Sequence, residues 1–211
     1  MIENQGTRAQ KLVTIYDDIY DLPDCRAYYR AMDDAGFRTA HFAAAAFRDA
    51  LQAVKKERGL DRLRVVDFAS GYGIAAQLMR FDIALDDVLT RYRDAGFDDA
   101  SAIDVVNADK SWLSQKAQLG SDRFLGSDIA GNALAYGRDV GSFDEVFPEN
   151  LQDTPPSDAL AAELAEVDLI VECGSVAHML PDALDRLLSA CTRKPWVIMS
   201  PIRGNDTDEA L

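Results

Sequence analysis

The stretch that decides the fold is VVDFASGYGIAAQLMR, residues 65–80. It opens as a β-branched apolar run containing Asp67, passes through a short loop with Gly71 and Gly73, and continues in a helical pattern from Ile74. A strand, a glycine turn and a helix in this order form the first unit of a doubly wound α/β fold. The stretch therefore raises the question of which ligand takes a carboxylate beside a glycine turn.

Four further runs rich in apolar and β-branched residues follow this unit, and helical patterns separate them. The run VDLIVEC is continuously apolar at its centre, as expected for a strand that is covered on both faces. Strands that alternate with helices predict a Rossmann-like, doubly wound and mostly parallel sheet. The four runs are FLGSD (124–128), FDEVF (143–147), VDLIVEC (167–173) and PWVIMS (195–200).

The periodicity of the remaining chain is helical and suggests two regions. Residues 1–60 predict an N-terminal helical cap, whereas residues 61–211 predict the Rossmann-like domain, because the strand patterns begin only there. Residues 81–123 carry no strand pattern and predict a helical insertion after the first unit. Within it, residues 101–119 are expected to form one long helix. The N-terminal cap is the expected substrate lid.

Charge and composition exclude several classes of function. The chain has 211 residues and a formal charge of −14, of which residues 1–60 contribute nothing. So acidic a domain repels phosphate backbones, which argues against a nucleic-acid substrate. No apolar run is long enough to span a membrane and the N-terminus lacks a signal-peptide core, so we expect a cytoplasmic protein. Three scattered cysteines and two histidines predict no metal site.

Two ligands compete for the glycine loop. Residues 71–76 satisfy GxGxx(G/A), the dinucleotide fingerprint, although one match of this pattern has little specificity. The acidic ribose ligand should follow about 20 residues later. Asp128 is the best acid at a strand end, and it follows Asp67 by 61 residues. An NAD(P)-dependent oxidoreductase therefore remains an alternative, with the insertion accounting for the spacing.

Asp67 discriminates better between the two ligands. It stands at the end of the first strand, where it would lie beside a bound ligand. Its carboxylate repels a pyrophosphate but attracts a ligand that carries an ammonium and a sulfonium group, as S-adenosylmethionine does. The two glycines would let the backbone approach such a ligand closely.

With these features, the sequence resembles the class I S-adenosylmethionine-dependent methyltransferases over residues 62–203. The resembling motifs are VVDFASGYG, FLGSDIAGNALAYGR, FDEVFPENL and VDLIVECGSVAHML, in the order expected of the family. The resemblance implies methyl transfer to O, N or C of a small-molecule metabolite. It also implies that Asp67 holds the methionine amino group, Asp128 both ribose hydroxyls, and Ile129 the adenine. The other implied cofactor residues are Ala69, Ser70, Gly71, Gly73, Asn150, Leu151, Glu172, Cys173 and Gly174.

The sequence departs from the family pattern in three places. Ala69 stands where the family has its first loop glycine, a change that is tolerated if its φ is negative. The helical insertion is unusual, and the hairpin strands that follow the fifth strand are expected to be short or missing. An unpaired sheet edge would favour a homodimer or a partner chain. A non-catalytic methyltransferase-like subunit is therefore a further alternative.

Candidate residues for the acceptor side are few. His178 follows the fourth strand and is the candidate general base or substrate contact, the alternative being a packing role. The N-terminal helices supply the candidate substrate-binding residues Tyr16, Tyr20, Arg26 and Tyr29. In similar enzymes an N-terminal tyrosine covers the cofactor, and Tyr16 or Tyr20 would take that place. Ordinary core aromatics and solvated arginines are the alternative interpretation.

Overall fold

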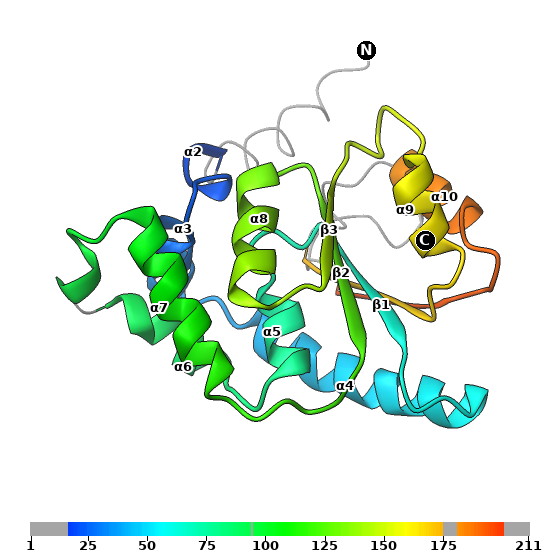
Figure 1. Ribbon diagram of the computed structural model, residues 1–211, viewed down its shortest axis with the longest axis horizontal. Helices are drawn as coiled ribbons and strands as arrows, with labels where there is room; N and C mark the ends of the chain where they lie inside the picture. The colour runs from blue at the N-terminus through cyan, green and yellow to red at the C-terminus, as the bar shows by residue number, and fades with distance from the viewer. Residues whose placement is uncertain (1–16, 94, 175–180, 201–211) are drawn as a thin grey trace, which may run out of the picture.

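The computed structural model describes residues 17–93, 95–174 and 181–200 (Figure 1). None of the helices in these ranges is long and apolar enough to cross a membrane. In chain order the elements are α2 (Asp17–Tyr20), α3 (Arg26–Asp34), α4 (Thr39–Arg58), β1 (Arg64–Phe68), α5 (Ile74–Arg80), α6 (Leu85–Leu89), η1 (Thr90–Tyr92), η2 (Ala95–Phe97), α7 (Ala102–Ser114), β2 (Arg123–Asp128), α8 (Gly131–Val140), β3 (Glu145–Pro148), α9 (Asp158–Leu164), β4 (Leu169–Cys173), α10 (Pro181–Ser189) and β5 (Trp196–Ser200).

The five strands form one sheet in the order β3-β2-β1-β4-β5, and every neighbouring pair is parallel. This confirms the predicted α/β class and all five predicted strands. The chain order reverses between β1 and β4, which run side by side although a long segment of chain separates them. In open sheets of this type the ligand binds outside the carboxyl ends of the strands at that reversal.

Helices cover both faces of the sheet. The strand β4 is therefore buried on both faces, which explains its continuously apolar sequence. Leu169 and Val171 pack on one face with residues of α4 and α5, whereas Ile170 packs on the other face with residues of α9 and α10. The three side chains are fully buried. Figure 1 shows α4, α5 and α8 on one side of the strands and α9 and α10 on the other. The result is a three-layer α/β arrangement.

The long helix α4 belongs to the sheet layer. Its apolar residues Phe47, Leu51 and Val54 recur at helical spacing and are buried against the sheet. The helix ends at Gly59, whose φ of 65° is the left-handed conformation of a helix C-cap. In the structure α4 lies beneath the sheet, whereas α2 and α3 lie beside the insertion (Figure 1). The proposed division at residue 60 into a cap and a Rossmann-like domain stays a prediction.

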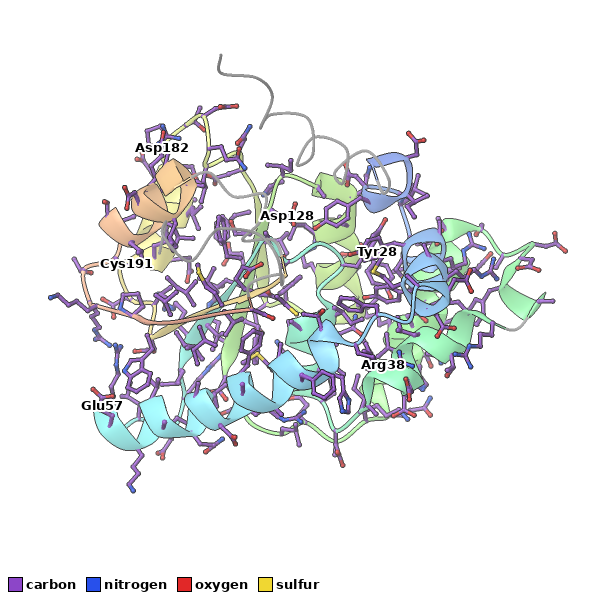
Figure 2. The ribbon with its side chains drawn as sticks, turned by 180° about the vertical axis from the view of Figure 1, so that it is seen from behind. Tyr28, Arg38, Glu57, Asp128, Asp182 and Cys191 are labelled. Atoms are coloured by element: carbon purple, nitrogen blue, oxygen red, sulfur yellow. The ribbon has the colours of Figure 1, made fainter. Side chains whose placement is uncertain are left out.

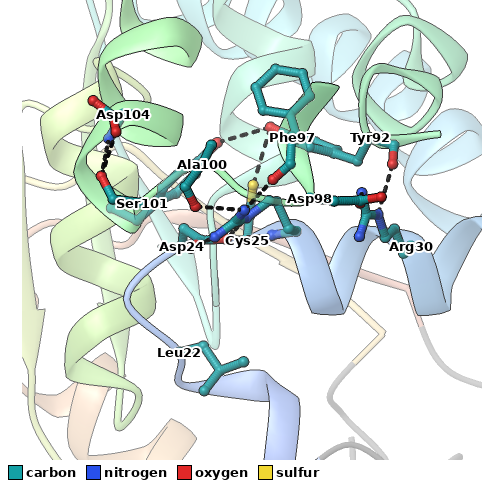
Figure 3. Close-up of polar contacts among 12 residues, drawn as sticks. Leu22, Asp24, Cys25, Arg30, Tyr92, Phe97, Asp98, Ala100, Ser101 and Asp104 are labelled. Carbon is teal, nitrogen blue, oxygen red and sulfur yellow. Dashed lines mark hydrogen bonds and ion pairs between the residues drawn. The ribbon is translucent and has the colours of Figure 1, made fainter. Parts of the chain in front are cut away.

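The insertion is helical, as predicted, and polar contacts join it to α3 (Figure 3). Arg26 donates hydrogen bonds to the carbonyl oxygens of Phe97 and of Ala100, the latter at 2.9 Å. Arg30 donates to the carbonyl oxygen of Tyr92 at 2.7 Å. These bonds place α3 and the insertion in a common cluster of buried apolar side chains. The helix α3 and the insertion therefore form one packed body.

The strand β5 forms one edge of the sheet. Trp196 and Val197 are 42% and 38% exposed there. An unpaired edge would offer its backbone groups to a strand of another chain. The homodimer therefore remains an expectation, which no contact in the described part of the chain tests. The prediction that the hairpin strands after β5 are short or missing concerns residues 201–211, which lie outside the described residues.

Candidate functional site

The candidate site lies at the carboxyl ends of β1, β2 and β4, around the glycine loop that joins β1 to α5. Figure 2 shows Asp128 in the upper middle of the molecule, to the left of Tyr28, and Glu57 at the lower left, at the far end of α4. In the strand register Phe68 pairs with Glu172, and Asp67 pairs with Val171. Side chains alternate along a strand, so Asp67 and Glu172 lie on opposite faces of the sheet. Asp67 shares its face with α5.

The loop from Ala69 to Gly73 turns by alternating left-handed residues. Ala69, Gly71 and Gly73 have φ values of 53°, 51° and 79°. The Ser70 carbonyl oxygen accepts a hydrogen bond from the Gly73 amide at 2.9 Å, which closes the turn before α5 begins. A Cβ on Gly73 would lie 2.8 Å from the ring of Phe143. Gly73 therefore has no room for a side chain, because the ring of Phe143 fills the space beside it. The sequence had suggested only a cofactor contact for this glycine.

Ala69 departs from the sequence expectation. Its φ is positive, at 53°, whereas the substitution of the family glycine was expected to be tolerated through a negative φ. An alanine in the left-handed region costs roughly 1 kcal/mol, because its Cβ approaches the following carbonyl oxygen. The protein accepts this strain in the loop that a ligand would contact.

Replacing Ala69 by glycine is accordingly expected to stabilise the protein by roughly 0.5–1 kcal/mol, since glycine adopts a positive φ without strain. Urea denaturation measures the change. The matched control is Ala35→Gly, at an exposed position with a φ of −74°, which should destabilise the protein by a similar amount. Equal destabilisation by both substitutions would show that Ala69 is unstrained.

Asp67 is buried beneath this loop, with an exposed fraction of 1%. The backbone amide of Ala76, in the first turn of α5, hydrogen-bonds to the carboxylate. Among the described residues its Oδ2 atom has no hydrogen-bond partner. Burial, together with the smaller effect of the negative charges of Glu172 and Asp128, raises the pKa of Asp67 to about 8. The site thus holds a buried acid whose pKa is raised mainly by desolvation.

Asp128 holds the other side of the loop. Its Oδ1 atom accepts a hydrogen bond from the Ala130 amide at 2.9 Å, and its Oδ2 atom accepts one from the Gly71 amide at 2.8 Å. The hydroxyl of Tyr20 also donates to Oδ2, at 3.0 Å. The carboxylate is 7% exposed, at the mouth of the site. The structure therefore brings Asp67, Asp128 and the glycine loop together, as the sequence predicts.

The remaining predicted cofactor residues differ in how they reach the site. Ile129 is 68% exposed beside Asp128. Leu151 is buried in the cluster beneath α9 and α10, so its side chain belongs to the core. Asn150 is exposed, and its side-chain amide donates to Asp153 at 2.7 Å. Cys173 is half-buried at the end of β4; burial raises the pKa of its thiol, as do the charges of Asp67 and Glu172.

Several polar side chains near the loop have unused hydrogen-bonding capacity. The hydroxyl oxygens of Ser70 and Ser127 are buried and lack a partner within the part of the chain that the structure describes. Gly174 follows β4 with a φ of 94°. Buried polar atoms without partners are rare in folded proteins and often mark a place where a ligand binds.

The predicted substrate residues are dispersed. Tyr29 is fully buried among apolar side chains. Arg26 pairs with Asp24 at 2.9 Å and uses its other donors on the insertion. Of this set, Tyr20 is brought to the loop. Tyr16 and His178 lie outside the described residues.

Two residues that sequence reasoning missed connect the N-terminal segment to the site. Tyr72, the residue between Gly71 and Gly73, accepts a hydrogen bond from the Leu22 amide at 2.9 Å and donates to the Leu22 carbonyl oxygen at 3.0 Å. Asp21 accepts hydrogen bonds from backbone amides at the start of α8. Tyr72 could have been noticed in the sequence, because it is an aromatic residue inside a glycine loop. Asp21 carries no local signal.

The arrangement can bind a cation at Asp67 and hydroxyl groups at Asp128. Three buried carboxylates, Asp67, Asp128 and Glu172, lie at these strand ends. Within the described ranges no group of three or more His, Cys, Asp or Glu side chains could hold a metal ion. The three described carboxyl groups at these strand ends favour a positively charged ligand over an anion.

No protein-family model matches this sequence, and no curated protein matches it. Among solved structures it is similar to a Methanococcus maripaludis protein that is provisionally described as an S-adenosyl-L-methionine-dependent methyltransferase. The identity is 13% and the TM-score 0.39, over 100% of this chain and 72% of the other. A likeness at this level carries no argument about function, so function rests on the site itself.

Proposed function

We propose that this protein binds S-adenosylmethionine at the carboxyl end of the sheet and transfers its methyl group to O, N or C of a small molecule. The observation that carries the proposal is the carboxylate of Asp67, which is buried at a glycine turn with one oxygen unpartnered among the described residues. A buried acid whose pKa is strongly raised by desolvation is a candidate functional group. An ammonium group is the complement that this acid lacks.

The residues present fit the cofactor. Asp67 would hold the ammonium of the methionine portion, and Asp128 would accept hydrogen bonds from the ribose hydroxyls. The exposed Ile129 would pack on the adenine. Gly71, which has no Cβ, would allow the ligand to approach the loop backbone. Bound in this way, the cofactor supplies an electrophilic methyl group on a sulfonium centre.

The role of the chain in the reaction is mainly orientation. Methyl transfer is an in-line substitution, so holding the ligand at two carboxylates separated by a rigid loop fixes the direction of the methyl group. The buried carboxylates at the strand ends would also stabilise a positively charged ligand in the ground state.

The alternative ligand is a nicotinamide dinucleotide, because the strand order is also that of dinucleotide-binding domains. A pyrophosphate on this loop would face Asp67 and Asp128 with no described cation between them. At an effective dielectric constant of about 20, two unit charges at 4 Å repel by about 4 kcal/mol. The electrostatics of the loop therefore favour the cationic ligand.

Titration calorimetry with S-adenosylhomocysteine and with NADH tests the proposal. We expect S-adenosylhomocysteine to bind and NADH not to bind. Asp128→Asn should weaken S-adenosylhomocysteine binding by about 10- to 100-fold, because a charged acceptor of the ribose is lost. The control is Asp139→Asn, an exposed acid on α8 that pairs with Arg138 at 2.9 Å. NADH binding without S-adenosylhomocysteine binding contradicts the proposal.

Binding is also expected to release a proton below pH 8. The pKa of Asp67 is about 8 in the ligand-free protein, so the acid is largely protonated at pH 7. An ammonium beside the carboxylate lowers its pKa, and the proton leaves as the ligand binds. Affinity should thus rise by nearly tenfold between pH 6 and pH 7 and level off near pH 8.

Calorimetry in buffers with different ionisation enthalpies measures this proton release directly. We expect close to one proton per ligand at pH 6.5 in the wild type and close to none in Asp67→Asn. Proton uptake in the wild type, or equal release by both proteins, contradicts the assignment of the ammonium to Asp67.

Turnover separates an enzyme from a non-catalytic subunit with the same pocket. If the protein is an enzyme, S-adenosylhomocysteine accumulates when an acceptor is supplied with S-adenosylmethionine. Binding without turnover for any acceptor would favour the non-catalytic alternative.

A further inference from the structure

The hydroxyl of Tyr20 uses the acceptor that the proposed ligand needs. It donates to Asp128 Oδ2 at 3.0 Å, and the same oxygen accepts the Gly71 amide at 2.8 Å. The tyrosine also covers the glycine turn. A Cβ placed on Gly71 would lie 2.8 Å from the Tyr20 hydroxyl oxygen and 3.1 Å from its Cζ atom. Tyr20 therefore fills the space over Gly71 into which a ligand would have to fit.

Tyr20 belongs to a short segment, residues 17–24, that we call the strap. Polar contacts hold the strap at two points. At the first, Asp21 Oδ1 accepts the amides of Asn132 and Ala133 at 2.7 and 3.2 Å, so that it caps the N-terminus of α8. At the second, the backbone of Leu22 exchanges hydrogen bonds with the hydroxyl of Tyr72.

The ring of Tyr20 makes the main apolar attachment of the strap, because it packs against the buried cluster around α3. Asp18, Asp21, Leu22 and Pro23 are all exposed. The ring of Tyr20 packs edge-on against Tyr28, with ring centroids 5.3 Å apart. A segment held by a few polar contacts near the surface and by one aromatic ring opens at a lower free energy than the core does. Displacing it therefore costs less than displacing any part of the sheet layer.

The chemistry at Asp128 favours exchange with a ligand. Burial and the neighbouring carboxylate raise the pKa of the Tyr20 hydroxyl, so it remains a neutral donor. A single phenol gives the carboxylate one hydrogen bond, whereas a ribose presents two adjacent hydroxyls. A ligand with a ribose diol can replace the phenol at Asp128 and add a further bond.

We propose that the strap is a built-in competitor of the cofactor: Tyr20 occupies Asp128 in the ligand-free protein, and the ribose displaces it and lifts the strap off the glycine turn. This inference rests on the proposed function. It assigns to Tyr20 a gating role in place of the substrate contact expected from the sequence. The opposite arrangement, in which Tyr20 stays in place and covers the bound cofactor, is the competing outcome.

Titration of the full chain with S-adenosylhomocysteine distinguishes the two. Tyr20→Phe removes the hydrogen bond to Asp128 and should bind the ligand about tenfold more tightly than the wild type. Asp21→Ala releases the strap from α8 without altering Asp128 or the loop, and should tighten binding about threefold. Tyr28→Phe is the matched control, because it removes a hydroxyl from the adjacent ring and leaves the bond between Tyr20 and Asp128 in place; its affinity should be unchanged.

Hydrogen exchange supplies a second readout. The amides of Asn132 and Ala133 bond to Asp21, so lifting the strap should make them exchange faster when S-adenosylhomocysteine is bound. Slower exchange of these amides on binding, or unchanged or weaker binding by Tyr20→Phe, overturns the strap proposal alone. If neither the wild type nor any of the three variants binds S-adenosylhomocysteine, the proposed function fails and the strap proposal fails with it.

Discussion

Replacing Asp67 by asparagine is expected to stabilise the folded protein by about 5 kcal/mol at pH 8. Asp67 has a pKa of about 8 in the folded protein, far above the value of roughly 3.9 in an unfolded chain. Between these values the folded state keeps a proton that the unfolded state has lost. The contribution of Asp67 to stability is therefore complete below about pH 4 and is lost as the pH rises to 8. Asparagine does not titrate and avoids this loss.

Urea denaturation at pH 5 and pH 8 measures this effect. The gain from Asp67→Asn should be about 1.5 kcal/mol at pH 5 and should grow to about 5 kcal/mol at pH 8. Asp139→Asn, on the exposed face of α8, should give no gain at either pH. An equal gain at both values, or a loss at pH 8, would mean that Asp67 does not titrate as a buried acid.

The same substitution should remove function, which explains why an acid occupies this position. A neutral amide at residue 67 packs as well as a carboxyl group but offers no charge to an ammonium. The acid at this position would thus lower the folding stability but allow the ligand to bind, as is common for buried functional acids. A variant that gains both stability and affinity does not fit this account.

Replacing Asp109 by alanine is expected to destabilise the protein by about 3–5 kcal/mol. The carboxylate is 2% exposed and joins the insertion to α8. It accepts hydrogen bonds from Arg91 at 2.8 Å, from the Tyr92 hydroxyl at 2.6 Å and from the Tyr136 hydroxyl at 2.9 Å. Alanine would leave two buried hydroxyls and a partly buried guanidinium without their acceptor.

Urea denaturation measures the loss of folding stability, and comparison with two further variants assigns its cause. Asp109→Asn keeps one oxygen as an acceptor and should cost about 1–3 kcal/mol. Asp139→Ala removes an exposed ion pair and should change the stability by less than about 0.5 kcal/mol. If Asp109→Ala stays within 1 kcal/mol of the wild type, the cluster does not hold the insertion in place.

The sheet and the acidic residues at the carboxyl ends of its strands could be predicted, because both depend on local sequence patterns. The strands were recognisable from apolar runs, and the positions of Asp67 and Asp128 followed from where those runs end. The end of α7 was predicted at residue 119 but lies at Ser114. After it, Phe81 and Gln118 form an antiparallel bridge, and this extended pairing ends the helix early. Such a partner, distant in sequence, cannot be seen from helical periodicity.

Other features of the site depend on geometry that residue types do not encode. The positive φ of Ala69 is imposed by the turn between two fixed elements, and alanine alone predicts the opposite sign. The bond between Tyr20 and Asp128 joins residues 108 positions apart. The side chain of Leu151, one of the implied cofactor residues, packs in the core, and its part in cofactor binding stays a prediction.

The most direct test of the central claim compares two ligands on two proteins. S-adenosylhomocysteine and 5′-methylthioadenosine share the adenosine and the sulfur, but only the first carries the ammonium that Asp67 is proposed to hold. Measured by calorimetry at pH 8, Asp67→Asn should weaken S-adenosylhomocysteine binding by about 100-fold and 5′-methylthioadenosine binding by less than about twofold. Equal weakening of both ligands, or none for either, would contradict the claim that Asp67 recognises the charged end of the cofactor.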